Sequence, residues 1–351
     1  MAEQSTERAL ERGFRKTAAH KLVLGAVARV ESGDGSHSWC GTAGSIERSS
    51  SFFIASTTKL YVTATLLKLQ ELGWLRLDDP ASAYVERAAL EGVHRYRGKD
   101  YSFELTIRQL MAHTSGLPDY LQAVRDDGKS LLQHIQAGRD RAWTFEQALE
   151  DTKRLKPLFA PGTPGKAHYS DTNYQVLGNI IEQVTGGTVD SAFRTYIYEP
   201  LGLRNTYMYQ NAGDDPDVPL YYNNEPLHIP QAMASFGPDG GIVSTADELL
   251  TFLRAFFEGR LFPKQELPAL YAWNRIFFPL QYGAGVAKFQ MPRVFTMFRQ
   301  FPELLGHSGL SGTFAYYCPA EDVYFAGTVN QVAQPSLPYR LMMELLNRVK
   351  T

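Results

Sequence analysis

The sequence has 351 residues, which is enough for one large domain or two medium ones. Its hydrophobic fraction of 44% is ordinary for a globular protein, and its net charge of −2 argues against nucleic acid as the main partner. Two cysteines, Cys40 and Cys318, are too few for a disulfide framework, and both lie in strand-like runs as small hydrophobic residues.

The chain shows no sign of a leader, a membrane span or a metal site. Residues 1–4 lack the basic start of a signal peptide, and no apolar run approaches the length of a membrane span. The eight histidines are scattered, without the spacing of metal ligands. We therefore expect a soluble, cytoplasmic protein without a metal or other cofactor, unless a leader has been removed from the chain.

Secondary structure is predicted from hydrophobic periodicity, capping residues and turn residues. An amphipathic helix over residues 3–19 precedes strands at 22–31 and 38–43, and a buried helix begins at Ser56 and ends before Gly73. Further helices are predicted to open at Thr106, Thr144, Thr172, Thr188 and Ser244, and a last one covers residues 338–349. Strands are predicted at residues 282–289, 313–317 and 323–329, and loop at 211–238.

The order of these elements indicates the fold class. Strands and helices are segregated along the chain, which is typical of α+β folds. We expect one antiparallel sheet made of the N- and C-terminal strands, flanked by the N- and C-terminal helices. Residues 80–239 would form a mostly helical part inserted into an α/β part made of 1–79 and 240–351. The whole chain, 1–351, is then a single domain.

One stretch carries a pattern with catalytic potential, Ser56-Thr57-Thr58-Lys59 at the start of the buried helix. Three residues apart on a helix, Ser56 and Lys59 share a face. A lysine in an apolar setting can take the proton of a serine nucleophile, and the helix N-terminus can stabilise an oxyanion. The alternative is that Ser56 is an N-cap and Lys59 a solvated lysine, since this motif is common by chance.

Three other stretches have a functional and a structural interpretation. Tyr169-Ser170-Asp171 precedes a helix, so its tyrosine could lie beside the lysine, or Asp171 could simply be an N-cap. The run from Gly306 through His307 to Gly309 precedes a strand, and a glycine there permits close approach of a substrate. His113, at a helix end, is expected to be structural and to cap carbonyls of the last turn.

Together these stretches resemble the serine β-lactamase and penicillin-binding-protein superfamily, in its class-C-like branch with esterases and D-aminopeptidases. Ser56-Thr57-Thr58-Lys59 is similar to the nucleophile motif of that superfamily and Tyr169-Ser170-Asp171 to its Tyr-x-Asn motif. His307-Ser308-Gly309 takes the place of Lys-Thr-Gly. His113 to Leu117 and Gly240 to Ala246 resemble structural signatures of the family. The resemblance covers residues 22–347.

The resemblance implies acylation of Ser56, followed by hydrolysis of the acyl-enzyme by water. It implies that Lys59 and Tyr169 share the proton transfer, and that the N–H groups of Ser56 and Leu310 form the oxyanion hole. Two positions depart from the family pattern. A mostly neutral His307 would hold an anionic β-lactam less well than lysine, and an ionised Asp171 cannot donate a hydrogen bond as asparagine does.

These features favour a serine hydrolase that cleaves small esters or amides. The alternatives are a β-lactamase, D-alanyl carboxypeptidase or D-aminopeptidase, and a catalytically idle binding protein. The expected partner is a small-molecule ester, amide or peptide, and the sequence does not give the oligomeric state.

Asp171 could hold Lys59 charged, bind a substrate ammonium or act as an N-cap. The apolar residues between 291 and 305 could form a pocket wall for the substrate, a core edge or an oligomer contact.

Overall fold

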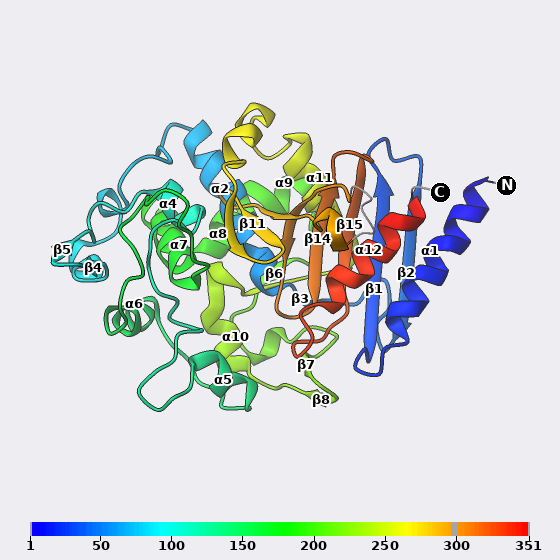
Figure 1. Ribbon diagram of the computed structural model, residues 1–351, viewed down its shortest axis with the longest axis horizontal. Coiled ribbons are helices and arrows are strands. Elements are labelled where there is room, and N and C mark those ends of the chain that lie inside the picture. The colour runs from blue at the N-terminus through cyan, green and yellow to red at the C-terminus, as the bar shows by residue number, and fades with distance from the viewer. Residues whose placement is uncertain (1, 296–300, 350–351) are drawn as a thin grey trace.

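The computed structural model describes residues 2–295 and 301–349, and an antiparallel sheet of eight strands dominates this part of the chain (Figure 1). From edge to edge the order is β10 (Asn274–Phe277), β11 (Leu280–Tyr282), β12 (Ala287–Phe289), β13 (Leu304–Ser308), β14 (Thr313–Cys318), β15 (Val323–Thr328), β1 (Gly25–Ser32) and β2 (Ser38–Gly44). β1 pairs with β15, so Val30 lies opposite Phe325. The N- and C-terminal strands therefore share one sheet, as predicted.

Both faces of the sheet are buried, because its strands alternate between two hydrophobic clusters. In β15, Val323 and Phe325 belong to one cluster, whereas Tyr324 and Ala326 belong to the other. Successive side chains of a strand point to opposite faces, so such a sheet needs a helical layer on each side.

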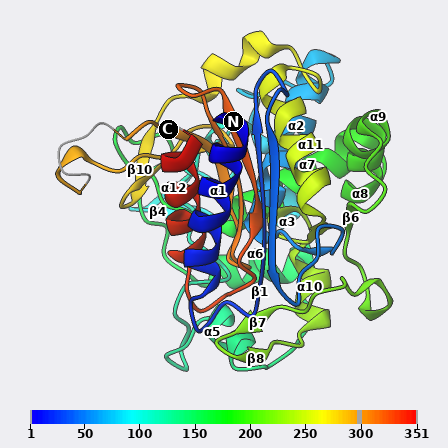
Figure 2. The ribbon, with the colours of Figure 1, turned by 90° about the vertical axis from the view of Figure 1, so that its right-hand side faces the viewer.

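The terminal helices form one of these layers. α1 (Ala2–Ala18) and α12 (Leu337–Val349) lie side by side on one face of the sheet (Figure 2). Phe14 of α1 packs edge-on against Trp39 of β2, with ring centroids 5.7 Å apart, and Leu341 of α12 is fully buried in the same cluster. A large antiparallel sheet flanked by helices confirms the predicted α+β class.

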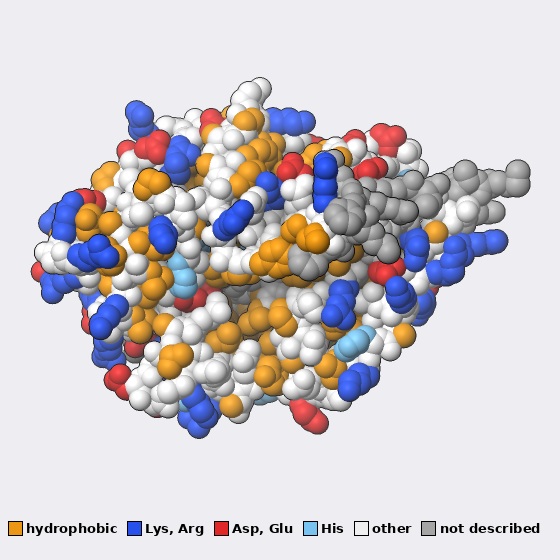
Figure 3. Space-filling view, viewed as in Figure 1, with side chains coloured by type: hydrophobic (Ala, Val, Ile, Leu, Met, Phe, Trp, Pro, Cys, Tyr) orange, Lys and Arg blue, Asp and Glu red, His pale blue; other side chains and the backbone are white. Residues whose placement is uncertain are grey.

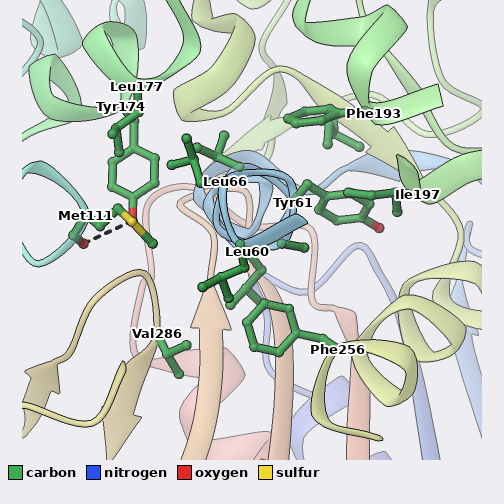
Figure 4. Close-up of a cluster of buried hydrophobic side chains, with 14 of the residues drawn as sticks. Leu60, Tyr61, Leu66, Met111, Tyr174, Leu177, Phe193, Ile197, Phe256 and Val286 are labelled. Carbon is green, nitrogen blue, oxygen red and sulfur yellow. Dashed lines mark hydrogen bonds between the residues drawn. The ribbon is translucent and has the colours of Figure 1, made fainter. Parts of the chain in front are cut away.

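The opposite face of the sheet carries α2 (Thr58–Glu71) and α11 (Ala246–Glu258). α2 is buried around its circumference, since side chains that leave it in different directions, such as Tyr61 and Leu66, are inaccessible to solvent (Figure 4). Tyr61 stacks on Phe252 of α11 with ring centroids 3.6 Å apart. The prediction of a helix buried on most sides is therefore correct, and a helix buried in this way has little freedom to move.

Residues 80–239 cover the far side of α2. They contain α3 (Arg87–Leu90), α4 (Ile107–Met111), α5 (Leu131–Gln136), α6 (Phe145–Lys153), α7 (Asp171–Thr185), α8 (Val189–Phe193), α9 (Glu199–Leu201) and α10 (Pro230–Phe236), with the short hairpins β4–β5 (Arg95–Tyr96, Lys99–Asp100) and β7–β8 (Tyr221–Tyr222, Glu225–Pro226). Capping boxes form at Thr106 and Thr144, where the sequence predicts them.

A small sheet joins β3 (Phe52–Phe53), β9 (Ile242–Ser244) and β6 (Tyr207–Met208). The division into a helical and an α/β part stays a proposal.

Two predictions about local structure are wrong, and strand β13 was not predicted. The strand predicted at residues 282–289 is two strands, β11 and β12, because Gly285 has a φ of +83° and the chain turns there. The predicted loop at 211–238 contains α10 and the β7–β8 hairpin. The run from Gly306 to Gly309 precedes a strand, β14, as predicted, but His307 also lies within β13, which was not predicted from the sequence. Among the described residues, no helix is long and apolar enough to cross a bilayer.

The burial of α2 can be tested with a matched pair of leucines. Leu66 is inaccessible to solvent, whereas Leu72, at the C-terminal end of the same helix, is 43% exposed. We expect Leu66→Ala to lower the free energy of unfolding by about 2–5 kcal/mol, because it leaves a cavity. Leu72→Ala should cost roughly 0.5 kcal/mol. Urea unfolding measures both, and equal losses would contradict the buried position of α2.

Candidate active site

The turn that carries Ser56 lies between β3 and α2. Ala55, directly before it, has a φ of +45°, a conformation that is unfavourable for residues other than glycine and that is found at functional sites. Ser56 belongs to a single 3₁₀ turn, Ala55–Thr57, that runs into α2, so the predicted position at the helix start is nearly right. The Ser56 side chain is half-buried and borders a cavity.

Lys59 is completely buried below Ser56. Its Nζ lies 3.2 Å from Ser56 Oγ, 2.7 Å from Asp171 Oδ1 and 2.5 Å from the Asp239 carbonyl oxygen. The solvated-lysine alternative is therefore wrong. Burial alone would lower the pKa of Lys59, but the carboxylate of Asp171, followed by Tyr169 and Asp239, outweighs burial and raises that pKa above its usual value. Lys59 is charged at neutral pH.

Asp171 is buried at the first position of α7, and Ser170 occupies the N-cap position. The N-cap alternative for Asp171 is therefore wrong. A carboxylate at a helix N-terminus is stabilised by the helix dipole, and here it also forms the ion pair with Lys59. Of the roles considered from the sequence, the geometry favours holding Lys59 charged. Binding of a substrate ammonium stays a hypothesis.

Tyr169 lies beside the same lysine. The Lys59 Nζ is 5.2 Å from the centre of its ring and equally far from the ring of Tyr174. Burial raises the pKa of the Tyr169 phenol, while the neighbouring charge of Lys59 and hydrogen bonding by Ser56 oppose that rise. The phenol is therefore neutral in the resting site, with its O–H available as a donor next to Ser56.

His307 faces the cavity from β13 but is buried. Its Nδ1 lies 2.8 Å from the Ser308 carbonyl, and its Nε2 lies 2.9 Å from the Tyr282 hydroxyl. Since a carbonyl can only accept, Nδ1 carries the proton and Nε2 accepts from Tyr282. Burial, together with the charge of Lys59, lowers the pKa of His307 to about 3. The imidazole is neutral, so it supplies no positive charge for a substrate carboxylate.

His113 supports the Tyr169 segment from the end of α4. Its Nδ1 accepts hydrogen bonds from the Ser170 N–H at 3.2 Å and from the Asn173 side-chain amide at 3.0 Å. Its ring lies 4.4 Å from the ring of Tyr169. The structural interpretation is supported: the backbone N–H of His113, which has a φ of +57°, caps the last turn by donating to the Leu110 carbonyl at 3.2 Å, whereas the ring nitrogen Nδ1 accepts and caps no carbonyl.

Asp239 is a part of the site that sequence reasoning missed. Its carbonyl accepts a hydrogen bond from Lys59 Nζ at 2.5 Å, and its Oδ2 accepts from the Tyr120 hydroxyl at 2.8 Å and from Gln175 Nε2 at 2.9 Å. Burial, followed by the nearby charge of Asp171, raises the pKa of Asp239 to about 8. An aspartate in a Gly-rich turn carries no sequence signal for this role, since the contact with Lys59 uses the backbone.

Gly309 and Leu310 border the same cavity as Ser56. A Cβ built on Gly309 would lie 2.3 Å from the Ile54 carbonyl and 3.0 Å from Ala55 Cβ, so only glycine lets this turn approach the Ser56 turn. Within residues 2–295 and 301–349, neither the Ser56 N–H nor the Leu310 N–H donates to a backbone carbonyl. Both donors are thus available to a substrate oxygen.

These residues open onto a cavity of about 470 Å³, visible as the hollow in the middle of the face in Figure 3. Ser56, Tyr169, Asp171, Asp239, His307, Gly309 and Leu310 all border it. The described part of the apolar stretch, 291–294 and 301–305, does not border it. Phe301, Leu304 and Leu305 are buried in the core, so the predicted pocket wall is wrong for them, while Met297 and Phe298 lie outside the described residues.

Three relatives show what the chain is similar to. A protein of Bacillus subtilis (strain 168), provisionally named a penicillin-binding protein, is 25% identical over 229 residues, which cover 63% of this chain and 50% of that protein. The chain thus spans about half the length of that curated relative. A D-stereospecific amidohydrolase from a Streptomyces species is 29% identical with a TM-score of 0.74, over 93% of this chain and 95% of that one.

A hydrolase with promiscuous acyltransferase activity shares the fold over 100% of both chains, with a TM-score of 0.79 and 21% identity. A family model described as Beta-lactamase matches residues 11–343. That match covers nearly the whole chain and includes every residue of the site described above. The chain therefore belongs to the beta-lactamase family.

Proposed function

We propose that this protein is a serine acyl-hydrolase that cleaves small neutral amides or esters through an acyl-enzyme on Ser56. The observation that carries the proposal is the buried lysine whose Nζ contacts both Ser56 Oγ, at 3.2 Å, and a carboxylate, Asp171, at 2.7 Å. A serine hydroxyl becomes a nucleophile only when a nearby group takes its proton. The arrangement supports such a proton path.

The proton path follows from the charge of Lys59. A charged ammonium cannot accept a proton, so Lys59 alone is not the base in the resting site. It can pass one of its protons to Asp171 while it receives the proton of Ser56, because it contacts both. Ser56 Oγ then attacks the substrate carbonyl, and the neutral Tyr169 phenol protonates the leaving nitrogen or oxygen. The stored proton returns to Tyr169 through Lys59.

The N–H groups of Ser56 and Leu310 would hold the oxyanion that forms during attack. Fixed donors in a site screened from water stabilise such a charge without reorganisation. In the second step a water molecule attacks the acyl-enzyme, with Tyr169 and Lys59 moving its proton back to Ser56. The same residues thus serve both steps in opposite directions.

The charges around the cavity support neutral substrates. Among the described residues, its lining includes Asp171 and Asp239 but no lysine or arginine, and His307 is neutral. A substrate carboxylate would meet the carboxylate of Asp171 and no exposed cation, which is unfavourable in a partly buried site. This disfavours the β-lactamase and D-alanyl carboxypeptidase alternatives. The name of the Streptomyces relative, a D-stereospecific amidohydrolase, supports amide cleavage.

The proposal predicts a difference between substrates. A neutral nitrophenyl ester should be turned over much faster than a cephalosporin, which carries a carboxylate.

Ser56→Ala should abolish turnover, and Lys59→Ala and Tyr169→Phe should each reduce the acylation rate by about 10²–10⁴-fold. The exposed Ser49, seven residues upstream, provides a matched control, so Ser49→Ala should behave as wild type.

Stopped-flow absorbance measures both substrates, and circular dichroism checks that each variant is folded. Wild-type ester turnover in folded Ser56→Ala would rule out the proposed nucleophile. A cephalosporin turned over as fast as the ester would instead restore the β-lactamase alternative. A protein that turns over no substrate and takes up no fluorophosphonate label would be the idle binding protein.

The role of Asp171 predicts a specific pH dependence. Without its carboxylate, burial lowers the pKa of Lys59, so this lysine can lose its proton and act as a base directly. At pH 7, Asp171→Asn should reduce kcat/KM by about 10²–10⁴-fold. Its activity should then rise with pH as Lys59 deprotonates. The measurement is kcat/KM on the nitrophenyl ester between pH 6 and 10.

Asp78→Asn provides the control for this experiment, because Asp78 forms an exposed ion pair with Arg108 at 2.7 Å. Its pH profile should match the wild-type profile. If Asp171→Asn is as active as wild type at pH 7, or more active, the carboxylate hinders the lysine and is not the proton acceptor. Thermal unfolding of the same samples separates lost catalysis from lost structure.

A further inference from the structure

The cavity beside Ser56 extends well beyond the catalytic residues, and one side of it is a hydrophobic cluster. Leu132 and Ile135 of α5 line it together with Met233 and Phe236 of α10. Leu132 and Phe236 are half-buried, so they present apolar surface to the cavity. This side comes from two short helices that lie close together in the lower part of Figure 1.

The facing side is the β10–β11 hairpin at the edge of the sheet. Phe277 and Phe278, at its tip, also line the cavity, although they are 53% and 68% exposed. Large apolar side chains with this exposure, next to a cavity, mark a binding surface more often than a core. The ring of Phe277 meets the ring of Tyr169 edge-on, with centroids 6.0 Å apart. Phe277 therefore lies next to Tyr169, and Phe278 follows it in the cavity lining.

The hairpin is held in place from its base. Tyr282, which ends β11, donates to His307 of β13, and its hydroxyl lies 3.3 Å from that of Tyr174 in α7. β11 is also paired with β12 along its length, with Leu280 opposite Phe289. The position of the aromatic tip is therefore coupled to the same strands and helix that carry the site.

We propose that the cavity binds a bulky apolar acyl group, and that Phe277 and Phe278 form its outer wall. The inference rests on the proposed acyl-enzyme mechanism and names its substrate class: amides or esters of medium-chain or aromatic acids. A volume of about 470 Å³ lies within the range of small-molecule sites and far exceeds the needs of an acetyl group. The apolar character of both walls selects against polar acyl groups.

The acyl group is the part of the substrate that such an enclosure suits. It stays attached to Ser56 through both chemical steps, so apolar contacts with it act on both transition states. The leaving group must escape to water after the first step, and an apolar enclosure around it would slow that escape. The cavity is therefore assigned to the acyl side rather than to the amine or alcohol.

The test is a series of nitrophenyl esters from acetyl to octanoyl, which all share one leaving group. In the wild-type protein, kcat/KM should rise by up to about fourfold for each methylene that becomes buried, until the cavity is full. Phe277→Ala and Phe278→Ala should flatten this rise. Phe277→Leu should retain most of the rise.

Trp74 supplies the control, since it is 49% exposed and follows α2, at the end of that helix remote from Ser56. Trp74→Ala should reproduce the wild-type trend. A second series, with a fixed acetyl group and alcohols of increasing length, should show little dependence on length. Thermal unfolding of each variant shows whether a loss of the trend comes from a loss of structure.

The outcomes separate this inference from the proposed function. Ester turnover that requires Ser56 but does not depend on acyl length would overturn the acyl pocket and leave the serine mechanism standing. A trend in the alcohol series instead of the acyl series would place the leaving group in the cavity and overturn the assignment. A trend that survives in folded Phe277→Ala and Phe278→Ala would remove the hairpin as its wall. Absence of turnover and of labelling at Ser56 would refute the proposed function itself.

Discussion

The buried ion pair of Lys59 with Asp171 sets the geometry of the whole site. A completely buried ammonium is costly unless every proton finds an acceptor, and removing one partner of a buried pair costs about 3–5 kcal/mol. Lys59 meets this requirement with Ser56 Oγ, Asp171 Oδ1 and the Asp239 carbonyl. These acceptors come from the start of α2, the start of α7 and the turn before β9. The need to satisfy one lysine therefore fixes how three elements meet.

The packing of the fold leaves the residues around Lys59 little freedom to move. α2 is packed against the sheet, α11 and α7, so Lys59 cannot swing toward solvent. The left-handed Ala55 turns the chain into α2, and Gly309 lets the next turn approach it closely. In the proposed mechanism, preorganisation of this kind would hold the N–H groups of Ser56 and Leu310 in position for an oxyanion before a substrate arrives. Ser56 and Leu310 lie at the edge of the apolar cavity and form part of its lining.

The features that could be predicted from the sequence are those that depend only on residues close together in the chain. The spacing of Ser56 and Lys59 follows from a helix repeat, and the capping boxes at Thr106 and Thr144 formed as expected. The ion pair of Asp171 could be considered beforehand only as one of several roles, since it joins residues far apart in the chain. Asp239 could not be found, because Lys59 contacts its backbone. α10 lies in a polar region and depends on tertiary packing, and apolar residues near 301 could not be assigned to core or cavity by pattern alone.

In the proposed mechanism, Ser56 carries the acyl group during turnover. Mass spectrometry of the intact protein, quenched in acid within milliseconds of mixing with an excess of a slowly hydrolysed ester, detects such an intermediate. We expect a mass increase equal to one acyl group, located by peptide mapping on Ser56 and absent in Ser56→Ala. An adduct on another residue, or product formation at the wild-type rate with no adduct at any quench time, would contradict this mechanism.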